Sequence, residues 1–119
     1  MLRFAGFDFI EFSVDESDER LSRLDWNDET INNLLRTLID NNFYFNSMCL
    51  SAHRRFPFGS KNEETRKKAL EIMEKALILA KKLGIRIIQI AAYDVLWKSW
   101  FWDSKKLFKW YERMCKTCK

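Results

Sequence analysis

The sequence contains a single histidine, a single proline and no long uninterrupted apolar run. A membrane-spanning helix needs about 20 consecutive apolar residues, so we expect none in this chain. The N-terminal stretch MLRFAGFDFIEF has acidic residues among its apolar ones and lacks a small-residue cleavage site. It is therefore not expected to be a secretory signal. The three cysteines are an odd number, and without an export signal we expect reduced thiols and a cytoplasmic protein.

The cysteines and the histidine also argue against a metal site. Cys115 and Cys118 are separated by two residues, but a zinc site needs two further ligands at suitable spacing, and the sequence offers none. With one histidine in the chain, a metal-ligating role for His53 is not expected. We therefore predict that Cys115 and Cys118 are free thiols, and that Cys49 and Met48 are core residues of a strand.

The excess of positive over negative charge lies at the end of the chain. The formal net charge is +4, yet residues 1–97 hold 14 Lys and Arg against 15 Asp and Glu. Residues 98–119 hold seven basic side chains and two acidic ones. The neutral body gives no support to a nucleic-acid partner, which would need a basic surface along the phosphate backbone.

Hydrophobic periodicity predicts alternating strands and helices. Apolar runs at residues 8–13, 43–50 and 85–91 are typical of short strands. Apolar residues spaced by three and four predict an amphipathic helix before the second run and a longer one, from about Asn62 to Leu83, before the third. The order β-α-β-α-β favours an α/β fold in which helical crossovers join parallel strands.

Polar residues indicate where both helices begin and end. Asp25 or Asn27 is suited to begin the first, and Asn41-Asn42 to end it. For the second helix, we expect a capping box formed by Ser60 and Glu63 at the start and Gly84 just past the end.

The unusual polar segments all follow the predicted strands. EFSVDESDER follows the first strand, SAHRRFPFGS the second and AAYDV the third, whereas the opposite loops are the plain DNN and LG. Ligand sites of parallel α/β folds form from the loops at the carboxyl ends of the strands. We therefore expect the functional site at that rim of the sheet.

Three stretches carry a family resemblance: GFDFIEFSVDESDERLSRLDW, SMCLSAHRRFPFGS and LGIRIIQIAAYDV. They resemble the L-ribulose-5-phosphate (L-xylulose-5-phosphate) 3-epimerases, also labelled hexulose-6-phosphate isomerases, which are xylose isomerase-like (β/α)8 TIM barrels. The resemblance covers about residues 5–95 and implies a partial barrel with strands two to four of eight. Because a full barrel takes about 250 residues, we expect an N-terminal fragment of such an enzyme.

The resemblance also implies a reaction. Such enzymes epimerise a pentulose phosphate at C3 through an enediolate, with two acidic side chains on opposite faces and a divalent metal ion polarising the carbonyl. The family takes those glutamates and metal ligands from the second half of the barrel. We therefore expect no catalytic residue and no bound metal in this chain, which is inactive alone or becomes active with another chain that supplies the remaining strands.

Substrate contacts are predicted for four residues on or near the rim. Glu11 lies within the first strand, where an acid needs a polar cavity or a partner; contact with substrate, or pairing with Arg54 or Arg86, satisfies it. His53 is predicted to hydrogen-bond a sugar hydroxyl or carbonyl, with a structural loop histidine as the alternative. Tyr93 is predicted to offer its hydroxyl and ring to the sugar.

Arg54 and its neighbour Arg55 have two interpretations. A guanidinium pair is suited to hold a phosphate or carboxylate, so Arg54 is included among the substrate-binding residues. A salt bridge from these arginines to the acidic loop at Asp15–Asp18 explains them equally well.

Residues 96–119 form a separate tail after the barrel-like residues 1–95. The tail is predicted to be a basic amphipathic helix from its apolar stripe, Trp97, Phe101, Ser104, Phe108, Tyr111 and Cys115. Such a stripe most often covers a local core; a weaker alternative is contact with a membrane surface or a partner. A non-catalytic interaction module acting through this helix is the alternative function.

Three parallel strands leave two open sheet edges. We expect a sheet designed for a closed barrel to expose apolar inner-face residues, for which Ile10, Met48 and Ile88 are the candidates. The isolated chain is therefore predicted to self-associate or to be marginally stable.

Overall fold

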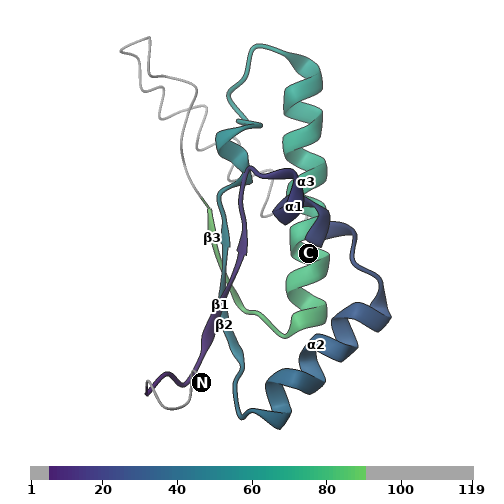
Figure 1. Ribbon diagram of the computed structural model, residues 1–119. Coiled ribbons are helices and arrows are strands. Elements are labelled where there is room, and N and C mark those ends of the chain that lie inside the picture. The colour runs from purple at the N-terminus through teal and green to yellow at the C-terminus, as the bar shows by residue number, and fades with distance from the viewer. Residues whose placement is uncertain (1–5, 91–119) are drawn as a thin grey trace.

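The sheet and its helices form two layers in the computed structural model, which describes residues 6–90 (Figure 1). The elements follow the predicted alternation, with short 3-10 turns added to it. In chain order they are β1 (Ile10–Val14), α1 (Asp18–Leu21), η2 (Ser22–Asp25), α2 (Asp28–Asp40), β2 (Phe45–Leu50), η3 (Ala52–Arg54), α3 (Glu63–Leu83) and β3 (Ile87–Ile90).

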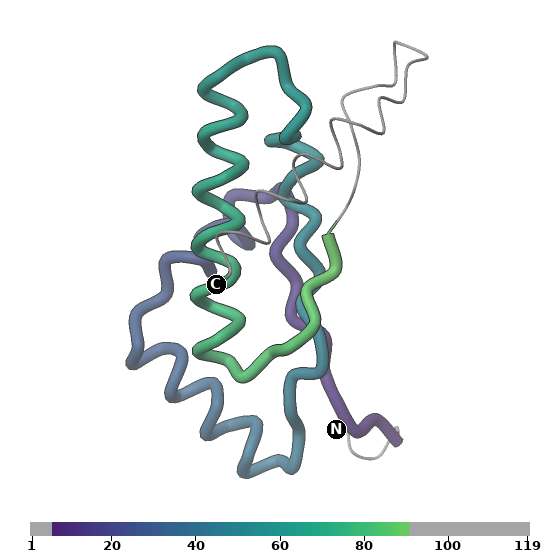
Figure 2. The backbone as a smooth tube through the Cα atoms, turned by 180° about the vertical axis from the view of Figure 1, so that it is seen from behind, coloured from purple at the N-terminus to yellow at the C-terminus, as the bar shows by residue number. Residues whose placement is uncertain are grey.

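The three strands are parallel and lie in the order β1-β2-β3. Both views place α2 and α3 on the same side of the sheet (Figures 1 and 2). The predicted α/β arrangement of parallel strands and crossover helices is therefore confirmed for residues 6–90. The predicted helix of the tail, with Cys115 and Cys118, lies outside the described residues.

The core lies between the sheet and the helices. The strand register aligns two rows of apolar side chains on the helix-facing side: Phe12, Met48 and Ile88, then Val14, Leu50 and Ile90. Met48, Leu50 and Val14 have no exposed surface. Ile72, Met73, Ala76 and Leu79 of α3 complete this core. Burial of each large apolar side chain contributes roughly 1.5–3 kcal/mol, so this face holds the fold together.

The opposite side of the sheet, which we call the inner face, is mostly polar. It consists of the alternate positions of the same strands: Glu11, Ser47 and Ile87 in one row, and Ser13, Cys49 and Gln89 in the next. No helix among residues 6–90 covers this face (Figure 1).

The prediction of an apolar inner face is therefore wrong. Met48 is fully buried, and Ile10 and Ile88 pack against the core. Cys49, expected in the core, is half-buried on the inner face. The reason is the period of two along a strand: an almost continuously apolar run does not indicate which alternate set faces the helices.

Side-chain caps define the ends of α2 and α3. Asn27 is the N-cap of α2, and its side chain accepts a hydrogen bond from the Thr30 amide at 2.8 Å. The expected Asn41-Asn42 end is also present, and Asn42 has a left-handed φ of 55°. The cap of α3 is Asn62, so the predicted capping box at Ser60 is wrong. Gly84 ends α3 with φ 72°, as predicted.

None of the helices in residues 6–90 is both long enough and apolar enough to cross a bilayer.

Candidate functional site

The loops that follow β1 and β2 lie against each other at the rim. Arg55 Nη1 is 2.5 Å from Asp18 Oδ1 and donates a hydrogen bond to the Glu16 carbonyl at 3.2 Å. Arg54 Nη1 is 4.0 Å from Glu16 Oε1. The salt bridges to the acidic loop, one of the two interpretations of these arginines, are thus present. Because both pairs are exposed, each contributes little to stability.

Glu11 lies on the inner face and is held from the neighbouring strand. The Ser47 hydroxyl donates a hydrogen bond to Glu11 Oε2 at 2.8 Å. Ser47 itself is 5% exposed, whereas Glu11 is exposed. Within residues 6–90 this hydroxyl, and not Arg54 or Arg86, is the partner of the carboxylate.

His53 is buried between the loop after β2 and α3. Its ring is 1% exposed and stacks on Phe58, with centroids 4.2 Å apart. Nε2 lies 3.1 Å from the carbonyl oxygen of Ala69 in α3. Burial lowers the pKa of His53, and the hydrogen bond to the Ala69 carbonyl opposes this shift to a smaller extent. The neutral imidazole therefore links η3 to α3 through this hydrogen bond.

The tautomer of His53 follows from its partner. A carbonyl oxygen can only accept, so Nε2 carries the proton and Nδ1 is an acceptor. Nδ1 is buried and has no hydrogen-bond partner within the described part of the chain. Any group that satisfies it must be a donor, such as a hydroxyl or water.

The predicted site residues therefore occupy three different settings. Glu11 is on the inner face, Arg54 is exposed at the rim, and His53 packs against α3, which covers the opposite face of the sheet. Tyr93 lies outside the described residues. Contact of these four residues with a substrate stays a prediction.

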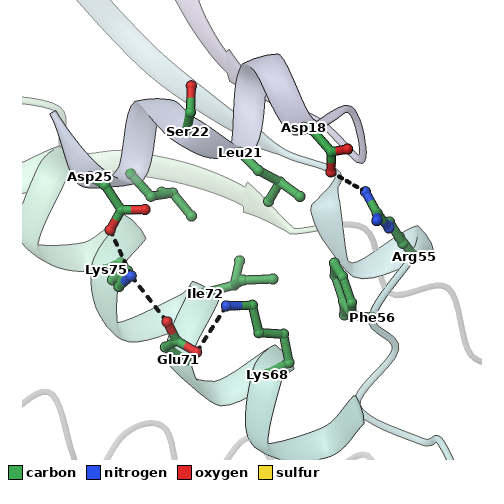
Figure 3. A pocket seen from close by; sticks show the side chains of 11 residues that line it. Asp18, Leu21, Ser22, Asp25, Arg55, Phe56, Lys68, Glu71, Ile72 and Lys75 are labelled. Atoms are coloured by element: carbon green, nitrogen blue, oxygen red, sulfur yellow. Dashed lines mark hydrogen bonds and ion pairs between the residues drawn. The ribbon is translucent and has the colours of Figure 1, made fainter.

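A pocket of about 310 Å³ lies on the helix side of the sheet, between the α1–η2 segment and α3 (Figure 3). Its charged side chains bind one another: Lys75 Nζ lies 2.6 Å from Asp25 Oδ1 and 3.0 Å from Glu71 Oε1. These contacts lower the pKa of Glu71 and raise that of Lys75. Glu11, His53 and Arg54 do not line this pocket. We therefore regard it as a salt-linked junction between elements, which borders the rim at the Asp18–Arg55 pair.

Two residues that contact the predicted site strand β1 were not predicted from the sequence. Nothing in the sequence around Ser47 indicates a role, because its contact with Glu11 depends on the register of the two strands. Arg23 Nη1 donates a hydrogen bond to the Ser13 carbonyl at 2.9 Å, and its guanidinium lies 5.6 Å from the centroid of the Phe12 ring. The stretch DERLSRLDW contained this arginine without indicating its target.

The described residues do not fit a divalent-metal centre. No group of three or more His, Cys, Asp or Glu side chains within residues 6–90 is placed to hold a metal ion. The six inner-face residues include one carboxylate, that of Glu11. A single carboxylate does not supply the ligand set that a catalytic metal requires.

Residues 2–118 match the xylose isomerase-like TIM barrel family. The chain is 64% identical over 94 residues to the probable L-ribulose-5-phosphate 3-epimerase UlaE of Mycoplasma pneumoniae, covering 79% of this chain and 31% of that protein. It is 55% identical over 98 residues to the putative L-ribulose-5-phosphate 3-epimerase SgbU of Escherichia coli K12, covering 82% and 34%.

A third relative, the L-ribulose-5-phosphate 3-epimerase UlaE of Escherichia coli, is 49% identical over 104 residues, covering 87% of this chain and 37% of the relative. The chain thus spans about a third of the length of the curated relatives that it matches. The parallel strands, the crossover helices and the match over residues 2–118 agree with the resemblance found in the sequence. The chain therefore belongs to the xylose isomerase-like TIM barrel family.

Proposed function

We propose that the chain is part of a sugar-phosphate 3-epimerase that interconverts L-ribulose 5-phosphate and L-xylulose 5-phosphate. The observation that carries this proposal is the 64% identity over 94 residues to a protein named as a probable L-ribulose-5-phosphate 3-epimerase. The polar inner face and the arginine-bearing rim support it, because a phosphorylated polyol needs hydrogen-bonding groups and positive charge.

In this proposal, residues 6–90 form part of the wall that binds the substrate. Glu11 accepts hydrogen bonds from sugar hydroxyls, and the guanidinium of Arg54 at the rim binds an anionic group. The Nδ1 atom of His53, a buried acceptor without a partner among residues 6–90, is the atom that a hydroxyl would bind. Tyr93 adds a further contact just past β3.

The proton transfers at C3 fall to other residues. Inversion of C3 needs an acid or base on each face of the carbon and stabilisation of the enediolate. The inner face of the described strands offers the single carboxylate of Glu11, and the described residues do not fit a metal. We therefore assign these residues to substrate binding, and place the acid/base groups and the divalent metal of such enzymes elsewhere in the barrel.

The proposal includes a cytoplasmic location. Cys49 is a free thiol, and free thiols persist in reducing compartments.

A chimera tests the proposed function. The aligned 94 residues of the Mycoplasma pneumoniae relative are replaced by those of this chain, and the purified chimera is given L-ribulose 5-phosphate and a divalent metal in deuterated water. We expect deuterium at C3 at a rate comparable with that of the intact relative. A chimera that folds cooperatively but incorporates no deuterium contradicts the proposal.

The chain alone is the second arm of this experiment. Because the described residues hold no acid/base pair, we expect no deuterium incorporation by the isolated chain. Turnover by the isolated chain contradicts the assignment of these residues to substrate binding alone.

A further inference from the structure

We propose that Ser47 is a positioning residue for Glu11, and that the two residues form a hydroxyl-binding position for the ketose part of the substrate. The inference rests on the proposed function and deepens it, because it names which portion of a pentulose phosphate meets the inner face.

The position of Ser47 in the sheet supports this role. Ser47 lies in the central strand, and the register places Glu11 beside it on β1 and Ile87 on β3. Ser47 is 5% exposed although it belongs to the uncovered face, whereas the side chains on either side are exposed. The hydroxyl has one hydrogen to donate, and the 2.8 Å bond commits it to Glu11 Oε2.

This hydrogen bond leaves the carboxylate half satisfied. An ionised carboxylate has two oxygens and about four acceptor positions. Within residues 6–90, Glu11 Oε1 has no hydrogen-bond partner, and the side chain is exposed. Ser47 thus restrains one oxygen and leaves the other available above the inner face.

The chemistry of Glu11 selects the group that binds there. A carboxylate accepts hydrogen bonds and repels a phosphate, so a sugar hydroxyl is the part of the substrate that it takes. Ile87, 53% exposed in the same row, offers an apolar surface to the C–H groups of the sugar. In the next row, Ser13, Cys49 and Gln89 continue the polar surface toward the rim.

A binding experiment on the full 119-residue chain tests this inference. L-Ribulose 5-phosphate is titrated into the wild type, Ser47→Ala, Ser47→Thr, Glu11→Ala and the double variant Glu11→Ala/Ser47→Ala, and binding is followed by ligand-observed NMR. We expect Ser47→Ala to weaken binding about 3- to 10-fold, the range for one hydrogen bond, and Ser47→Thr to retain affinity. In the Glu11→Ala background, loss of the Ser47 hydroxyl should cause no further weakening.

Two controls separate positioning from general damage. Thr37→Ala removes a hydroxyl that bonds the Asn33 carbonyl within α2, on the helix side of the sheet and away from the inner face, and should change the affinity less than about twofold. Inorganic phosphate, used as a second probe, should bind the wild type and Ser47→Ala equally. A purely structural serine would instead weaken binding to the same extent with and without Glu11.

Several results overturn the inference. Equal binding by wild type and Ser47→Ala does so, as does an equal effect of Ser47→Ala in both Glu11 backgrounds. A folded chain that binds no L-ribulose 5-phosphate also overturns it. The deuterium assay of the chimera decides the proposed function separately, because its readout does not depend on binding by the isolated chain.

Discussion

At the scale of the residue, His53 shows how burial controls ionisation. Its ring is packed between Phe58 and α3, and one of its two nitrogens has no partner in the described structure. An unsatisfied buried acceptor costs about 1–3 kcal/mol. Protonation adds a larger penalty, since it places a charge in the same site, and this is why burial lowers the pKa of His53.

This shift predicts a pH dependence of stability. A histidine with a folded-state pKa below its value of about 6.5 in the unfolded chain takes up protons preferentially on unfolding. The stabilisation is therefore fully present above pH 6.5 and is lost as the pH falls from there through the lower, folded-state pKa. We expect urea unfolding to give a smaller free energy of unfolding at pH 5 than at pH 7.5.

The variant His53→Gln is the control for this prediction. Its amide nitrogen can replace Nε2 as the donor to Ala69, but glutamine does not ionise in this range. The difference between pH 5 and pH 7.5 should shrink in the variant. An unchanged difference would assign the pH dependence to other groups. Asp15 and Glu71 have lowered pKa values, so their effects lie at more acidic pH.

Sequence reasoning identified some of these residues better than others. Asn27 and Gly84 were found because a helix cap depends on the local chain, which the sequence displays directly. His53 was placed at the rim, but its contact with α3 depends on how the loop folds back. Ser47 was missed, since its role depends on a residue 36 positions away.

At the scale of the element, β1 has an outer edge that β2 does not cover. In a parallel pair, the carbonyl of every second residue points away from the partner strand. The Ser13 carbonyl accepts from Arg23 Nη1, whereas Val14 accepts from the Ser51 amide beyond β2. Arg23 therefore occupies a backbone position at which another strand would otherwise pair.

Replacement of Arg23 tests the contribution of this contact. Arg23→Met keeps an apolar stem over Phe12 but removes the donor and the charge, so we expect a loss of about 1–2 kcal/mol in the free energy of unfolding. Arg20→Met, which removes a surface pair with Asp15, should cost less. Urea unfolding of both variants provides the comparison, and equal losses would contradict the special role of Arg23.

The types and order of the elements were predictable, whereas the orientation of the strands was not. Helix periodicity of 3.6 residues marks most of the buried side of α2 and α3, although Ile39 and Ile78 are exposed, and the helix boundaries were found nearly correctly. In β3 the apolar residues Ile87 and Ile88 are adjacent, and tertiary packing alone decides that Ile88 faces the core. The inner face of the sheet was consequently assigned to the wrong residues.

At the scale of the whole molecule, residues 6–90 form a wall with one protected side. The helices cover one face, and the inner face and the edges of β1 and β3 have no covering element among the described residues. Self-association therefore stays a prediction, now with a different cause. Its candidates are the exposed Ile87 and the open strand edges, since Met48 is buried.

A matched pair of substitutions tests where association occurs. Ile87 on the inner face is 53% exposed, and Ile78 on α3 is 59% exposed. We expect Ile87→Thr to shift the full chain toward monomer in sedimentation velocity at several concentrations, and Ile78→Thr to have a smaller effect. A monomeric wild type, or a larger effect of Ile78→Thr, would exclude association through the sheet.

The alternation along β2 divides its side chains between two independent tasks. Met48 and Leu50 fill the space beneath the helices, so their replacement disturbs packing, while Ser47 and Cys49 lie on the inner face, outside the apolar core. Substitutions at Ser47 and Cys49 can therefore change ligand preference without redesign of the apolar core. One side of a single strand thus anchors it in the core, while the side chains on the other side can be exchanged to bind different ligands.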